Sequence, residues 1–229
     1  MIRVEGVSKR FRHKVVLDRV SLEVPDGATT VILGPSGVGK TVLLKVMAGL
    51  LAPDEGQVFH DGHRIRAGRF AELAGGLGYV FQGGALFDSL TVAENVALAL
   101  EETTRLGRSE ISSRTDAVLR QVGMAEHADL YPRALSGGMT RLVAIARALV
   151  ADPSSIFYDE PTTGLDPVIR ERISALILRL CEKGNRAQVV VTHDLDAARR
   201  LADRTFMLRA GRIEQADNVR KEDYEQAYA

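Results

Sequence analysis

The sequence from position 34 to position 41 reads Gly34-Pro35-Ser36-Gly37-Val38-Gly39-Lys40-Thr41. This spacing matches the phosphate-binding P-loop, which requires a strand before it and a helix after it, and both patterns are present here. The glycines let backbone amides converge on phosphate oxygens, and the helix N-terminus adds a favourable field. We expect Lys40 to bridge the β- and γ-phosphates of a nucleotide and Thr41 to ligate Mg²⁺. The loop alone does not separate GTPases, kinases and transporters.

Short β-branched runs alternate with helix-period segments on both sides of this loop, which is typical of a largely parallel sheet covered by helices. The strand candidates are 2–4, 22–24, 30–33, 77–81, 155–158, 188–191 and 204–208. The first two alternate apolar with polar residues, as half-exposed antiparallel strands do, whereas 30–33 is continuously apolar, like a buried parallel strand. We therefore predict a single α/β domain.

Strand patterns are absent between Gly83 and about Val150, where helical patterns dominate. We predict a helical subdomain over about 83–150, inserted into a core formed by about 1–82 and 151–229. Thr91 with Glu94 three residues later indicates a capping box at a helix start. Asp166 followed by proline indicates another helix start, and we expect Gly184 to close that helix.

Composition narrows the classes of function. Lys plus Arg and Asp plus Glu each number 30, so charge gives no reason to expect nucleic acid as a partner. The single Cys181 excludes an intramolecular disulfide, and its apolar helical surroundings predict a packing residue. No stretch reaches the roughly 20 apolar residues that span a bilayer, and the N-terminus lacks the apolar core of a signal peptide. We expect a chain that does not cross a membrane by itself.

Two carboxylates, Asp159 and Glu160, come directly after the apolar strand candidate 155–158. Asp159 is suited to hold Mg²⁺, and Glu160 is suited to activate water as a general base. His193 follows another strand candidate, from whose end its imidazole could donate to the γ-phosphate. An acidic strand end and an isolated histidine are also common structural features. Neither indicates a catalytic site alone, and each supports one only together with the other motifs.

The stretch Leu135-Ser136-Gly137-Gly138-Met139 precedes a helix and resembles the signature sequence of ABC ATPases. Serine and two glycine amides at a helix N-terminus form an anion-binding device. The resemblance implies that Ser136, Gly137 and Gly138 close over the γ-phosphate held by a second copy of the chain, so that ATP lies between two subunits. Met139 and Leu142 depart from the commoner Gln and Arg of the family, without removing a phosphate contact.

Other positions resemble family elements in the expected order. Phe11 resembles the aromatic residue that stacks on adenine, although ordinary packing is an alternative. Gln82 resembles the glutamine that reaches Mg²⁺ and the attacking water. Asp166 resembles the aspartate that crosses the dimer interface. The fold that this implies is a P-loop NTPase (RecA-like) core with an antiparallel β subdomain and an inserted α-helical signature subdomain.

The resemblance also implies a function: an ATP-binding, ATP-hydrolysing homodimer that drives an integral membrane permease from the cytoplasmic face of the inner membrane. Stretches 39–45 and 80–92, with the signature ending in Met139, are similar to Mla-type (MCE-associated) phospholipid transport ATPases. This similarity suggests an MCE-domain lipid-binding protein and a small regulatory subunit as further partners. The charged stretch 220–224 does not follow that pattern.

Three apolar residues within 80–92 are suited to a socket for a permease helix: Leu86, Phe87 and Leu90. The alternative is that they pack inside the helical subdomain. Other functions also remain open, namely amino-acid or lipoprotein transport, a cell-division ABC ATPase that moves no substrate, and a translation or DNA-repair factor. The last class usually carries two cassettes or a coiled coil, and neither is seen here.

Overall fold

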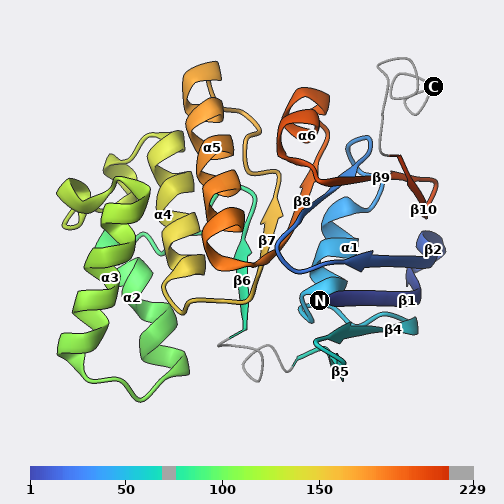
Figure 1. Ribbon diagram of the computed structural model, residues 1–229, viewed down its shortest axis with the longest axis horizontal. Helices are drawn as coiled ribbons and strands as arrows, with labels where there is room; N and C mark the ends of the chain where they lie inside the picture. The colour runs from blue at the N-terminus through green and yellow to red at the C-terminus, as the bar shows by residue number, and fades with distance from the viewer. Residues whose placement is uncertain (69–75, 217–229) are drawn as a thin grey trace.

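The computed structural model describes residues 1–68 and 76–216, apart from the side chains of residues 183 and 184 (Figure 1). The charged stretch 220–224 lies outside the described residues. A parallel sheet occupies the middle of the molecule, a smaller antiparallel sheet lies on one side of it, and a group of helices lies on the other (Figure 1). The predicted α/β fold is therefore confirmed.

The larger sheet has the strand order β10-β9-β3-β8-β7-β6. Its strands are β3 (Thr29–Leu33), β6 (Leu77–Val80), β7 (Ser155–Asp159), β8 (Ala187–Thr192), β9 (Arg204–Arg209) and β10 (Arg212–Gln215). All neighbours pair in parallel except β10, which runs antiparallel to β9. Since carboxyl ends of parallel strands meet at one edge, the segments after β3, β6, β7 and β8 come together there.

The smaller sheet has the order β2-β1-β4-β5 and is antiparallel throughout. Its strands are β1 (Ile2–Phe11), β2 (Lys14–Val24), β4 (Glu55–His60) and β5 (His63–Arg64). The sequence predicted the first two, which alternate as half-exposed strands do. It did not predict β4 or β5, because both are polar and depend on pairing with a neighbour.

The helices are α1 (Lys40–Met47), α2 (Val92–Thr103), α3 (Arg108–Val122), α4 (Gly137–Leu149), α5 (Pro167–Gly184) and α6 (Leu195–Leu201). Two short 3₁₀ turns, Ala125–His127 and Pro132–Ala134, lie between α3 and α4. Residues 83–150 are all described and contain no strand. The boundaries of a helical subdomain within the chain stay a prediction.

The predicted helix starts are confirmed, and one helix end is corrected. Thr91 and Glu94 form both hydrogen bonds of a capping box at α2, and Asp166 accepts two backbone N–H groups at the start of α5. Gly184 was expected to close α5 but belongs to the helix. The left-handed residue that ends α5 is Asn185, at φ 45°, since asparagine tolerates this conformation better than most residues.

Alternate residues of the parallel strands point into two hydrophobic cores. Val31 and Leu33 of β3 pack with the side of the sheet that faces α4 and α5, whereas Ile32 packs with α1 and the antiparallel sheet. A strand buried on both faces needs apolar residues at every position, as the continuous run predicted. Cys181 is a buried free thiol on α5 and serves as a packing residue, as expected.

Within residues 1–68 and 76–216, no helix combines the length and the apolarity that crossing a bilayer requires.

Candidate nucleotide site

The loop between β3 and α1 has the backbone of a phosphate-binding loop. Gly37 and Gly39 adopt φ values of 78° and 114°, a region that residues with a Cβ rarely enter. A Cβ on Gly34 would lie 2.6 Å from the carbonyl oxygen of Leu208, so β9 tolerates only glycine at the start of the loop. The helix α1 begins at Lys40 and directs its N-terminus at the same loop.

Lys40 is buried, and its side chain lies folded along the loop. Its Nζ donates to the carbonyl oxygens of Gly34 at 2.8 Å and Pro35 at 3.0 Å. The same Nζ lies 3.3 Å from Oε1 of Glu160, and both side chains of this ion pair are less than 10% exposed. The only charged group of the P-loop therefore lies between the loop and the carboxylate expected to act as the general base.

Thr41 and Asp159 approach each other at the end of β7. The Thr41 hydroxyl donates to Oδ1 of Asp159 at 2.8 Å, and the Tyr79 hydroxyl lies 3.4 Å from the other carboxylate oxygen. Burial raises the pKa of the Asp159 carboxyl above its ordinary value, because the charged form loses hydration. A divalent cation placed here would offset that penalty.

The oxygens that meet at this point suit Mg²⁺, which prefers hydroxyl, carboxylate and phosphate oxygens. Thr41 and Gln82 line the same cavity, and Asp159 is hydrogen-bonded to Thr41. In the described part of the chain, no three His, Cys, Asp or Glu side chains gather as a metal cage. A cation here would depend on phosphate oxygens as well as on protein ligands, which is how Mg²⁺ is usually bound with nucleotides.

Glu160 is held by several groups. Its Oε2 accepts from the Thr163 hydroxyl at 2.8 Å and lies 3.0 Å from Nδ1 of His193. Burial works to raise the pKa of Glu160, but the His193 and Thr163 contacts and the Lys40 charge outweigh it, so the pKa lies below its ordinary value. Glu160 also has a φ of 48°, a strained conformation of the kind found at functional sites.

One cavity of about 490 Å³ connects these groups. Its lining includes residues from the P-loop, from the end of β6, from the turn after β7 and from the end of β8: Ser36, Gly37, Gly39, Lys40, Thr41, Gln82, Glu160, Thr163 and His193. The parallel sheet thus brings together groups that are far apart in the sequence. The hydrogen bond from the Thr163 hydroxyl to Glu160 was not predicted from the sequence.

The signature residues lie outside this cavity. Ser136 is the N-cap of α4 and accepts from the backbone N–H of Met139 at 3.3 Å, and Gly137 follows it in the first turn. Gly138 is buried, and a Cβ there would lie 2.6 Å from Cγ2 of Ile169. The Asp166 side chain caps α5.

Phe11 does not line the cavity either. It is 45% exposed at the end of β1, with the Lys9 ammonium 5.5 Å from its ring centroid. Packing in the core is therefore excluded for Phe11, and adenine stacking stays a prediction.

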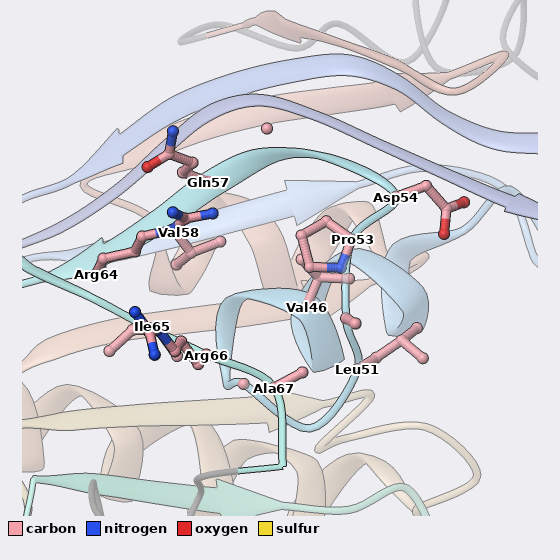
Figure 2. A pocket seen from close by; sticks show the side chains of 13 residues that line it. Val46, Leu51, Pro53, Asp54, Gln57, Val58, Arg64, Ile65, Arg66 and Ala67 are labelled. Carbon is pink, nitrogen blue, oxygen red and sulfur yellow. The ribbon is translucent and has the colours of Figure 1, made fainter.

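A second cavity, of about 430 Å³, lies between the segment after α1 and strands β4 and β5 (Figure 2). Figure 2 shows Asp54 and Arg64 at its two ends, and Arg66 beside Ile65. Each of these charged side chains is exposed. The buried charges that typify a catalytic site therefore belong to the first cavity.

A P-loop, Glu160 and His193 line one cavity, and Asp159 is hydrogen-bonded to Thr41 beside it. The site is that of a P-loop nucleotide hydrolase. The chain belongs to the ABC transporter family, which matches residues 17–163. It is thus an ABC ATPase cassette, the class that hydrolyses ATP.

Two relatives illustrate the family. The chain is 40% identical over 217 residues to the sulfate/thiosulfate import ATP-binding protein CysA 2 of Shewanella oneidensis, covering 93% of this chain and 61% of that protein. It is 38% identical over 211 residues to the intermembrane phospholipid transport system ATP-binding protein MlaF of Haemophilus influenzae, covering 91% of this chain and 80% of that protein. The chain thus spans about three fifths of the length of CysA 2 and of other bacterial sulfate/thiosulfate relatives.

Two solved structures share the fold. One is the dimeric post-hydrolysis state of the ATP-binding cassette MJ0796 bound to ADP and Pi, with a TM-score of 0.88, 32% identity, and coverage of 95% of this chain and 98% of that chain. The other is cbiO1 of Clostridium perfringens, part of the ABC transporter complex cbiONQ. Its TM-score is 0.84 and its identity 30%, with coverage of 94% of this chain and 88% of that chain. The expected architecture of core, antiparallel β subdomain and helices is thus confirmed.

Proposed function

We propose that this chain binds and hydrolyses ATP as a two-fold dimer and so powers a separate membrane permease. The observation that carries the proposal is the cavity in which Lys40, Thr41 and Glu160 meet Gln82 and His193. These are the groups that phosphoryl transfer needs: a cation for the phosphates, metal ligands, a base and a group that positions water. Membership of the ABC transporter family also supports ATP hydrolysis coupled to a permease.

In this account Lys40 and the P-loop amides hold the phosphates of ATP. Glu160, whose pKa is depressed, is ionised at neutral pH and can accept a proton from the attacking water. His193 contacts Glu160 at 3.0 Å and keeps its carboxylate oriented. Thr41, Asp159 and Gln82 would hold Mg²⁺, which neutralises the charge that develops on the phosphates. Bound phosphate would also compete with Glu160 for Lys40, freeing the base.

The position of the signature residues supports the proposed dimer. Ser136 and the amides that follow it form an anion-binding helix start, yet they do not line the cavity of their own chain. We propose that they close over the γ-phosphate of a second copy, with Asp166 near the interface. The relative MJ0796 forms a dimer in its ADP-bound structure, which supports this arrangement.

Glu160→Gln and Lys40→Ala test the hydrolytic part of the proposal. Without its base, the Gln variant should hydrolyse ATP at least about 100-fold more slowly while still binding it. The Ala variant loses a charged hydrogen-bond donor and should bind nucleotide about 10- to 100-fold more weakly. Phosphate release and titration with a fluorescent nucleotide measure the two effects. Wild-type turnover in Glu160→Gln would contradict the assignment of the base.

For the cargo we propose phospholipid, moved in the bacterial envelope by a permease with an MCE-domain protein and a small regulatory subunit. MlaF, which is 38% identical to this chain over 80% of its own length, supports the proposal. Phe87, in the stretch that resembles Mla ATPases, is 53% exposed, whereas Leu86 and Leu90 are partly buried. An exposed aromatic ring five residues after Gln82 suits a helix of a permease at the cytoplasmic membrane face.

Sulfate import is a second candidate, because CysA 2 is 40% identical to this chain. Amino-acid or lipoprotein transport and a cell-division role share the same catalytic groups and also stay open. Capture of the tagged chain from detergent-solubilised membranes, followed by reconstitution of the captured complex in vesicles, separates these cargoes. ATP-dependent movement of labelled phospholipid, without uptake of labelled sulfate, is the expected result, and the reverse would overturn the lipid assignment.

A further inference from the structure

Two arginines of α4 hold the backbone on either side of Gln82. Arg147 donates from Nη1 to the carbonyl oxygen of Ala85 at 2.7 Å and from Nη2 to that of Gly84 at 2.8 Å. Arg141, six residues earlier on the same helix, donates to the carbonyl oxygen of Phe81 at 3.0 Å. The segment that carries Gln82 is therefore bound to α4 before and after this residue.

The segment has an unusual conformation that makes the Arg147 contact possible. Gly83, Gly84 and Ala85 follow one another at φ values of 86°, 87° and 48°. A non-glycine residue at positive φ costs about 1 kcal/mol or more, so Ala85 needs compensating contacts. Because two neighbouring carbonyls meet one planar guanidinium, Arg147 provides such contacts with a geometry that lysine lacks.

Arg147 has no competing role among the described residues. It is half-buried, and its polar partners in the described part of the chain are these two carbonyl oxygens. It neither lines the nucleotide cavity nor contacts Asp159 or Glu160. Gly84 also packs closely on α4, because a Cβ there would lie 2.8 Å from Cγ2 of Thr140.

We propose that Arg147 is a positioning residue for Gln82, fixing the segment 83–85 to α4 so that Gln82 and the Ser136 end of α4 move as one unit. This inference rests on the proposed function, in which Gln82 serves Mg²⁺ and Ser136 serves the partner's nucleotide. A shift of α4 would then displace Gln82 from the cavity in the same step. Arg147 acts through the backbone and touches no reacting atom.

Arg147→Lys tests the inference, with Arg172→Lys as the matched control. Arg172 also donates to two consecutive carbonyls, those of Val122 and Gly123, at 3.4 and 3.5 Å, but away from the site. In Arg147→Lys, amides of 83–86 should exchange hydrogen about 10-fold faster, as a loosened local segment does. The Mg²⁺ concentration for half-maximal hydrolysis should rise about 10-fold, as loss of supporting contacts around a metal ligand does.

A merely structural role would lower the thermal midpoint and the Mg²⁺-free affinity for ATP together. We expect that affinity to stay within about twofold of wild type, because the P-loop is untouched. Unchanged exchange and unchanged Mg²⁺ dependence in Arg147→Lys would overturn the inference. The same holds if Arg172→Lys shows equal shifts.

Gly84→Ala is a second variant, used if Arg147→Lys does not fold. Its methyl group would meet Thr140 and displace the segment while Arg147 stays intact, so the Mg²⁺ requirement should rise again. A Gly84→Ala chain with the wild-type requirement would count against the inference. If the wild-type chain hydrolyses no ATP, the proposed function fails instead, and the hydrogen-exchange comparison alone decides whether Arg147 fixes the segment.

Discussion

Asp159 and Glu160 are neighbours in the sequence, yet their surroundings move their pKa values in opposite directions. Burial raises the pKa of Asp159, whereas for Glu160 the His193 and Thr163 hydrogen bonds and the Lys40 charge overcome burial. The raised pKa of Asp159 means that its charged form costs stability, whereas the lowered pKa of Glu160 keeps that carboxylate ionised for the proposed catalysis. The proposed metal ligand and the proposed base are thus distinguished by their environments.

Asp159→Asn should therefore stabilise the nucleotide-free chain while abolishing hydrolysis. A carboxyl whose folded pKa is raised opposes folding at neutral pH. This cost declines as the pH falls through the folded pKa and vanishes below the unfolded pKa, where the carboxyl is protonated in both states. The variant should have the higher thermal midpoint at pH 7, with the difference vanishing in acid. Its Mg²⁺-dependent turnover should fall at least about 100-fold.

Calorimetry at pH 7 and in acid measures the thermal midpoints, and a phosphate-release assay measures the turnover. Asp152→Asn is the control, since the Asp152 side chain is 81% exposed and pairs with Arg186. That variant should stay within about 0.5 kcal/mol of wild type. A lower thermal midpoint for Asp159→Asn at pH 7 would contradict the account of its burial.

The sequence predicted most residues of the cavity but not the contacts among them. Lys40, Thr41, Gln82, Glu160 and His193 all line it, because a P-loop and strand ends meet at one edge of a parallel sheet. The bond from Thr163 to Glu160 was missed. It depends on a turn in which Glu160 has positive φ, and no spacing pattern indicates that conformation.

At the scale of elements, predictability followed burial. The continuous apolar runs of β3, β7 and β8 were predicted because strands buried on both faces need such runs. Strands β4, β5 and β10 carry mostly exposed polar residues and owe their structure to antiparallel partners. Pairing of this kind is decided by tertiary context and leaves little trace in a local pattern.

Thr91→Ala tests the capping box at the start of α2. The Thr91 hydroxyl accepts from the Glu94 N–H at 3.2 Å, and the Glu94 carboxylate accepts from the Thr91 N–H at 2.7 Å. Loss of the cap should lower the free energy of unfolding by about 1 kcal/mol, measured by urea denaturation. Thr103→Ala, at the exposed end of the same helix, should change it by less than about 0.5 kcal/mol. Equal effects would contradict the capping role.

At the scale of the whole molecule, the two anion-binding helix starts serve different places. The start of α1 faces the cavity, whereas the start of α4, capped by Ser136, does not line it. If both bind the same nucleotide, two copies must face each other with ATP between them. The proposed coupling to a permease depends on this geometry, because opening and closing of the pair is the motion that a partner would sense.

The most direct test of this account is the mass in solution of the 24.9 kDa chain carrying Glu160→Gln. Light scattering with Mg²⁺ and ATP should give about twice the monomer mass, because ATP that is not hydrolysed stays bound between the two copies and holds them together. The same protein without nucleotide, or with Lys40→Ala added, should give the monomer mass. A monomer at every protein concentration with saturating Mg²⁺ and ATP would contradict the claim that ATP is bound between two copies.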